Sequence, residues 1–198
     1  MATLYKCLGP ERTACNGGTG QWLPPGEWMP PVEGELEPCW NGYHLCEWKD
    51  VLSWLNSELY EAEYRGESVK ASDKLVVREA RLTRRCEWWN ERSARLFACD
   101  CAERALPIYE KAYPGDTRPR HAIEVARLFA DGKATADQLA AATSAAGAAA
   151  WAAGAAGAAA WDAATSAAWD AAWDAERSWQ LERLAWYRDH YTTKGGER

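Results

Sequence analysis

Three residues in the N-terminal third of the chain, Cys39, His44 and Cys46, are of the types that hold zinc. Thiolate sulfur and imidazole nitrogen are the ligands that zinc prefers, and the spacing Cys-x4-His-x-Cys brings three of them within eight residues. Well-defined zinc sequences carry paired Cys-x2-Cys elements, which this segment does not have. We therefore expect no cofactor and favour buried free thiols, with zinc at these three residues kept as the alternative.

Other residues that could do chemistry do not form a recognised catalytic pattern. The histidines are scattered, and neither an HExxH element nor a phosphate-binding loop of the GxxxxGK[ST] type occurs. The glycine-rich segment 15–20 is not followed by a clear helix, so it is interpreted as a flexible loop. Cys99 and Cys101 lie two residues apart on an expected helix and face different directions, so they cannot form one site. These observations favour a protein that binds over one that catalyses.

Charged residues gather in two groups. Acidic residues alternate with apolar ones along an expected strand, which favours a solvated strand face, with a docking surface for a basic partner as the alternative. They are Glu58, Glu61, Glu63 and Glu67. Arginines are frequent in the helical part, and the pair Arg118 and Arg120 at a helix start could bind an anion. Pairing within the chain is the favoured interpretation, with Asp116, Glu103 and Glu124 as partners.

Net charge and cysteine content limit the class of protein to which the chain can belong. The 198 residues carry a formal charge of −6, and up to Ala80 there are 7 basic and 13 acidic side chains, whereas the remainder is balanced. An acidic surface repels nucleic acid and favours basic protein partners. No signal peptide is visible, so the seven cysteines are expected to be reduced thiols in the cytoplasm. Aspartates interrupt the alanine tract, which argues against a membrane span.

The pattern of elements predicts an α+β protein. Residues 1–82 are expected to form a small β-rich domain with one short helix at 47–57. Strands are expected at 3–8, 59–64 and 74–82, and a hairpin is expected to join 36–40 to 43–46 through the turn at Asn41-Gly42.

Residues 83–191 are expected to form an all-α bundle rich in alanine and tryptophan, followed by a flexible tail at 192–198. A helix is expected over 84–113, kinked or split at Pro107. A second helix begins at Arg118 with Pro119 in its first turn, and Thr135 with Gln138 forms a capping box before the alanine tract. Because one straight helix would be about 80 Å long, a break near 154–157 or 165–166 should give antiparallel helices.

The alanine tract contains an internal repeat in which residues 141–151 recur as 163–173. Eleven residues make about three helical turns, so repeated positions return to one face. On a continuous helix six tryptophans would lie within an arc of about 140°. A self-packed bundle is the favoured interpretation, a tryptophan-lined binding face or a homo-oligomer contact is the alternative, and ice binding is disfavoured because bulky rings roughen the surface.

The helical part resembles a family of bacterial immunity proteins linked to polymorphic toxin systems. The resemblance rests on Ala98–Arg104, Leu106-Pro107, Tyr113-Pro114 and Arg118–Arg127, followed by the alanine tract. The N-terminal part resembles an uncharacterised domain of bacterial and phage proteins in Leu4–Lys6, Cys39–Cys46 and the strand segments after residue 60.

The resemblance implies a non-catalytic protein that binds and neutralises a cognate toxin through a complementary surface. The candidate interaction residues are Asp100, Glu103, Arg104, Arg118, Arg120, Glu124, Arg127, Trp151, Trp161, Trp169 and Trp173. Two alternatives remain open. One is a phage or mobile-element accessory protein with a regulatory role. The other is an ADP-ribosyltransferase-like enzyme, which requires a cleft near Lys6 and His44 with a carboxylate from Glu61 or Glu63.

Overall fold

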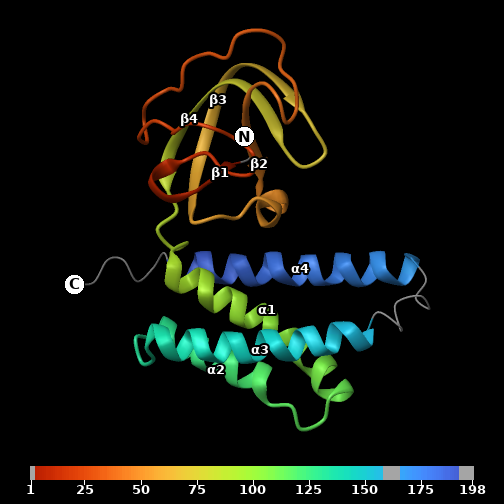
Figure 1. Ribbon diagram of the computed structural model, residues 1–198. Helices are drawn as coiled ribbons and strands as arrows, with labels where there is room; N and C mark the ends of the chain where they lie inside the picture. Colours follow the sequence, from red (N-terminus) through yellow and green to blue (C-terminus); the bar gives the residue numbers. More distant parts are fainter. Residues whose placement is uncertain (1–2, 158–165, 192–198) are drawn as a thin grey trace. The chain divides into compact units, whose positions relative to one another are not determined.

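The computed structural model describes the backbone of residues 3–157 and 166–191 and the side chains of residues 3–148 and 174–191 (Figure 1). The chain divides into two compact units, and the division falls between Asn90 and Glu91. An antiparallel sheet forms the first unit and helices form the second, so the predicted α+β class is confirmed. The division lies eight residues after the expected boundary at 82, because the last strand and the turn that follows it belong to the first unit.

The N-terminal unit is a closed barrel of four antiparallel strands in the order β1-β2-β4-β3 (Figure 1). Each strand pairs with two neighbours, and β1 pairs with both β2 and β3. The strands are β1 (Leu4–Leu8), β2 (Tyr43–Glu47), β3 (Glu58–Lys70) and β4 (Leu75–Arg85), with two 3-10 helices, η1 (Pro10–Arg12) and η2 (Trp48–Ser53). The expected strands at 3–8, 43–46, 59–64 and 74–82 are thereby confirmed, and the short helix expected at 47–57 is the 3-10 helix η2.

Apolar side chains from all four strands and from the loop after β1 fill the barrel. The largest connected group is Leu8, Trp22, Leu45, Tyr60, Ala62, Val77, Ala80 and Leu82. Leu8 and Leu82 are fully buried, and burial of such a side chain contributes about 1.5–3 kcal/mol. This core fixes the positions of β1 and β2, which also carry the polar residues discussed below.

The acidic residues of β3 are paired with arginines of β4. Glu61 lies opposite Arg84 in the strand register, with 2.5 Å between the carboxylate and the guanidinium, and Glu63 lies opposite Arg81 and contacts it. Glu67 contacts Arg78 in the same way. Opposite charges that face each other across two strands stabilise the hairpin. The acidic residues of β3 thus have counter-charges on the neighbouring strand, which agrees with the favoured interpretation of a solvated strand face.

The hairpin turn expected at Asn41-Gly42 and the strand expected before it are both absent, since the turn lies at residues 38–40 and Asn41 bridges back to Glu37. Residues 37–41 fold back on themselves, since the carbonyl oxygen of Glu37 accepts hydrogen bonds from the amides of Trp40 and Asn41. The Asn41 side chain donates to the carbonyl oxygens of Glu33 and Glu35, which holds the preceding loop against the turn. These local hydrogen bonds take the place of strand pairing in the expected hairpin.

In the described part of the C-terminal unit there are four helices, α1 (Glu91–Ala112), α2 (Arg118–Ala130), α3 (Ala136–Gly157) and α4 (Ser166–Tyr191). The predicted start of α2 at Arg118 and the capping box at Thr135 and Gln138 are confirmed, the latter by reciprocal hydrogen bonds of 2.8 and 3.2 Å. Pro107 lies inside α1, which continues past it to Ala112, so the expected split is wrong. The start of α1 at Glu91 instead of residue 84 follows from the length of β4.

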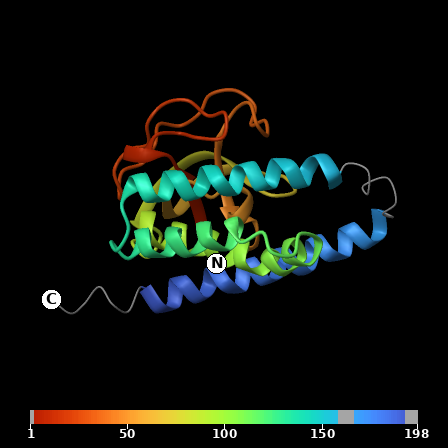
Figure 2. The ribbon, with the colours of Figure 1, turned by 60° about the horizontal axis from the view of Figure 1, so that its bottom comes forward.

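Helix α1 packs against both α4 and α2, and α2 packs against α3 (Figure 2). The buried side chains at these contacts include Leu96 and Leu106 of α1, Val125 of α2, and Leu184 of α4. Helices α3 and α4 run in opposite directions in both views, as expected. The expected breaks at 154–157 and 165–166 border residues 158–165, which lie outside the described part of the chain, as does the tail at 192–198. No helix among the described residues has the length and apolar character needed to cross a membrane.

We predict that Gly42→Ala destabilises the barrel more than Gly66→Ala. Both glycines have positive φ angles, +131° and +78°, so an added side chain is strained at each. A Cβ at Gly42 would lie 2.4 Å from Val76 Cγ1, and Val76 is fully buried, whereas a Cβ at Gly66 meets only ordinary contacts. We expect losses of about 3 kcal/mol or more and about 1 kcal/mol, respectively.

The measurement is urea unfolding monitored by hydrogen exchange of peptides from β2 and β4. These peptides report the stability of the barrel separately from that of the helices. Equal losses for the two variants would contradict the tight packing of Gly42 against β4.

Candidate functional site

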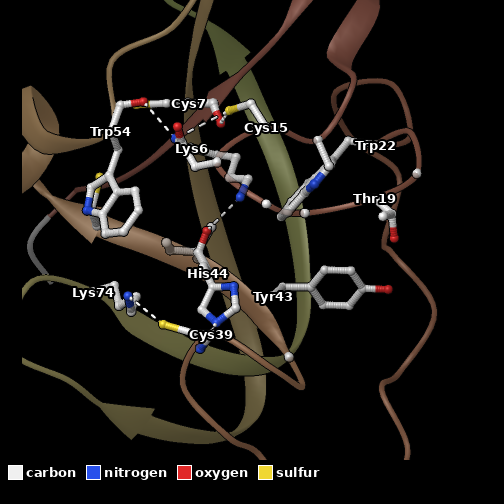
Figure 3. Close-up of a pocket in the computed structure, with 18 of the residues that line it drawn as sticks. Lys6, Cys7, Cys15, Thr19, Trp22, Cys39, Tyr43, His44, Trp54 and Lys74 are labelled. Carbon is white, nitrogen blue, oxygen red and sulfur yellow. Dashed lines mark hydrogen bonds between the residues drawn. The ribbon is translucent and has the colours of Figure 1, made fainter.

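The N-terminal unit contains a cavity of about 460 Å³ (Figure 3). Its wall is formed by β1, β2, the glycine-rich loop after η1, and the segments around Trp54 and Lys74. Lys6 of β1 and His44 of β2 lie at its centre, with Trp22 and Tyr43 on one side and Trp54 on the other (Figure 3). The size falls within the range of small-molecule sites.

Lys6 is held in the cavity by a carbonyl group and a ring. Its Nζ donates a hydrogen bond of 3.1 Å to the carbonyl oxygen of His44 and lies 4.9 Å from the centre of the Trp22 ring. Within the described residues Lys6 forms no ion pair with a carboxylate. Burial lowers the pKa of Lys6 below its ordinary value. The amino group therefore lacks a fixed counter-charge.

Three thiols lie close to Lys6 without acting as counter-ions. Cys15 Sγ donates to the carbonyl oxygen of Cys7 at 3.4 Å, and Cys46 Sγ donates to that of Tyr5 at 3.6 Å. A hydrogen bond with Cys46, followed by burial, raises the pKa of Cys7, and burial raises the pKa of Cys15. Both of these thiols therefore stay protonated and neutral at neutral pH.

His44 and Lys74 complete the polar lining. His44 Nε2 accepts a hydrogen bond of 3.1 Å from the Cys39 amide, and burial, then Lys6 and Lys74, lower the pKa of His44. Lys74 Nζ lies 4.6 Å from the centre of the Trp54 ring and 3.2 Å from Cys39 Sγ. Asp73 lies 3.6 Å from Lys74 and is not part of the lining.

The structure does not gather Cys39, His44 and Cys46 into a metal centre. Among the described residues no group of three metal-binding side chains is close enough to hold an ion. Cys39 Sγ accepts a hydrogen bond from Lys74, and the Cys39 amide donates one to the His44 ring. The Cys46 thiol donates a hydrogen bond to a backbone carbonyl oxygen of β1.

The cleft expected near Lys6 and His44 is present, but the carboxylates expected in it are not. Glu61 and Glu63 pair with Arg84 and Arg81 and do not line the cavity. The polar side chains of the lining are cationic or neutral. The arrangement can therefore bind an anion, and it offers no carboxylate for acid–base chemistry.

In the helical unit, Asp100 of α1 is the centre of a buried ionic network. Its side chain is 7% exposed and accepts three hydrogen bonds of 2.7 Å, from Arg127 of α2 and from Arg183 and Tyr187 of α4. Burial alone would raise the pKa of Asp100, but the hydrogen bonds from these three residues outweigh it and lower the pKa. Two of the candidate interaction residues, Asp100 and Arg127, therefore hold three helices together.

The remaining charged candidates lie at the surface, mostly in pairs. Arg127 also contacts Glu103 at 2.6 Å, and Arg118 and Arg120 pair with Asp116 and Glu110 at 2.6 and 2.7 Å. The predicted partners Asp116 and Glu103 are thus confirmed. Glu124 is exposed on α2 and forms no ion pair with the described residues.

Arg104 links α1 to α4. It pairs with Glu176 at 2.6 Å, and its guanidinium lies 4.7 Å from the centre of the Trp179 ring. Of the six tryptophans in the predicted face, only Trp179 and Trp186 have side chains that the structure describes. The side chains of Trp151, Trp169 and Trp173, and all of Trp161, lie outside the described residues.

The comparisons with known proteins bear on the helical unit. Residues 84–173 match the family model described as Imm-5 like putative immunity protein. This match supports an immunity-protein family and spans α1 to α3 and the start of α4. A search of curated proteins and a search of solved structures found no match to the chain.

The sequence pointed to a cleft near Lys6 and His44. It did not indicate that Trp22, Tyr43, Trp54 and Lys74 line the same cavity. These residues are distant in sequence, and only the barrel closure brings them together. The available signal was the glycine-rich segment 15–20, which now forms part of the cavity wall.

We predict that Asp100→Asn lowers the free energy of unfolding of the helical unit by about 2–3 kcal/mol. This is less than the loss from breaking a fully buried pair, because Arg127 and Arg183 are about a third exposed. The matched control is Glu103→Gln, which removes an exposed partner of the same arginine and should cost less than about 1 kcal/mol.

Thermal or urea unfolding of the variants, read by helical circular dichroism, checks this prediction at pH 7 and pH 3. Since the folded-state pKa of Asp100 is lowered, its contribution is complete above about pH 4 and is lost as the pH falls through the lowered pKa. The difference between wild type and Asp100→Asn should therefore shrink in acid. Equal losses for Asp100→Asn and Glu103→Gln would contradict the central role of Asp100.

Proposed function

We propose that the chain is an immunity-type protein whose helical unit binds and neutralises a protein toxin. The observation that carries the proposal is the match of residues 84–173 to an immunity-protein family. An immunity protein acts by occupying a toxin's surface, so it needs shape and charge complementarity and no catalytic groups. The proposal therefore requires an exposed face on the matched helices.

Helix α1 supplies such a face. Ile108 is 76% exposed, the highest value among the large apolar side chains that the structure describes in the helical unit. Arg104 and Lys111 lie four residues before it and three residues after it, so all three share one side of the helix. Trp179 of α4 lies against Arg104. Arginine and tryptophan next to an exposed apolar side chain are the composition typical of interface hot spots.

The chemistry of this face indicates its partner. An isoleucine between two cationic side chains fits an apolar pocket bordered by carboxylates. The Asp100 network holds α1 to α2 and α4, so we expect the face to be held in place before binding, which lowers the entropic cost of association.

The test begins with the purified full chain as bait in a lysate of its own host. The partner it captures should stop growth when it is expressed alone, and co-expression of the chain should restore growth. A stoichiometric partner without toxicity would contradict the immunity role and favour the accessory or regulatory alternative.

With the partner in hand, we predict that Ile108→Asp weakens binding at least tenfold, because it places a charge at the centre of the face. The matched control is Leu128→Asp, an exposed apolar residue of α2 that is outside the face. Isothermal titration measures both, with circular dichroism to verify folding. If Leu128→Asp abolishes binding and Ile108→Asp does not, the toxin partner stands and the proposed face is wrong.

A further inference from the structure

We propose that the cavity of the N-terminal barrel is a binding site for a small organic phosphate that carries a planar ring. The site lies outside the residues that match the immunity family and does not depend on the proposed function of the helices. The charge of the cavity lining, its aromatic walls and its backbone loop all favour such a ligand.

The charge of the lining selects an anion. Lys6, Lys74 and His44 line the cavity, and the lining contains no aspartate or glutamate. This is notable in a unit whose sequence is acidic overall. Lys6 donates to the carbonyl oxygen of His44, and Lys74 lies 3.2 Å from Sγ of Cys39, whose amide donates to the His44 ring, so both lysines lie around this histidine. A phosphate between them would gain two charge-assisted contacts.

The state of Lys6 supports this interpretation. Burial disfavours its charged form, and the neighbouring thiols of Cys7 and Cys15 are neutral. A lysine in such surroundings is stabilised by an entering anion, because the anion supplies the counter-charge that the protein does not.

The aromatic residues indicate a planar group next to the phosphate. Each lysine lies over a tryptophan, Lys6 at 4.9 Å from the Trp22 ring centre and Lys74 at 4.6 Å from that of Trp54. Tyr43 packs edge-on against Trp22 at 5.3 Å, which holds that indole in place (Figure 3). A ring that enters the cavity can stack on the partly exposed indole of Trp54 while its phosphate reaches a lysine.

The glycine-rich loop adds donors of the right kind. Asn16 and Gly17 have φ angles of +56° and +87°, and the backbone amides of Gly17 and Thr19 donate no hydrogen bond to the described residues. Amides in such a loop can donate to phosphate oxygens, and small side chains let a ligand approach the backbone closely. The volume of about 460 Å³ accommodates one ring with its phosphate.

Pyridoxal 5′-phosphate is a probe that reports both phosphate and ring recognition on the full-length protein. The unprotonated amine of Lys6 attacks the aldehyde carbon, an imine forms and water leaves. Borohydride then reduces the imine to a secondary amine, and mass spectrometry of peptides identifies the modified lysine. Pyridoxal, which has the same ring and aldehyde without the phosphate, is the matched reagent.

We expect half-modification of Lys6 at a concentration of pyridoxal phosphate at least tenfold lower than that of pyridoxal. Exposed Lys49 of η2 should show no such preference. Lys74→Gln should raise the pyridoxal phosphate concentration needed at Lys6 at least threefold, whereas Lys70→Gln, an exposed lysine outside the lining, should leave it unchanged. Circular dichroism confirms that both variants fold.

Protection distinguishes the ring from the phosphate. AMP should protect Lys6 at lower concentration than inorganic phosphate, and adenosine should protect it poorly. Equal modification by the two pyridoxal reagents would overturn the phosphate site, because the reactivity would then reflect the amine alone. Equal protection by AMP and inorganic phosphate would overturn the planar ring.

Discussion

The helical unit depends on one buried carboxylate. Asp100 on α1 accepts hydrogen bonds from Arg127 on α2 and from Arg183 and Tyr187 on α4, so a single side chain fixes the relative positions of three helices. An alanine-rich helix buries little apolar area, and the packing of such helices gains from a directional polar contact. Because the carboxylate is almost fully buried, it can hold this position only while all three donors are present.

Charged side chains at the surface of both units are also mostly paired within the chain. The glutamates of β3 are matched by arginines of β4, and Arg118 and Arg120 are matched by Asp116 and Glu110. Two features stand apart from this pairing. Ile108 is a highly exposed apolar side chain on α1, and the lining of the cavity around Lys6 contains no carboxylate. The proposed toxin contact and the proposed phosphate site are built on these two features.

Much of the fold could be predicted from local sequence signals. Strand alternation located β3 and β4, Pro119 located the start of α2, and the Thr135–Gln138 pair located the start of α3. The site could not be predicted, because its residues come from segments that only barrel closure brings together. Asp100 was identified by family resemblance as an interaction residue, and its burial depends on Arg183 and Tyr187, which are more than 80 positions away in sequence. Local patterns carry no information on such a contact.

The most direct test of this account is a double-mutant cycle between Asp100 and Arg183, with Asp100→Asn, Arg183→Gln and the double variant compared by urea unfolding. Contacting members of one network couple by about 0.5–3 kcal/mol. We predict a coupling free energy of at least about 1 kcal/mol, because Arg183 Nε lies 2.7 Å from the Asp100 carboxylate. Additive losses from the two substitutions would contradict the claim that this carboxylate holds α4 to α1.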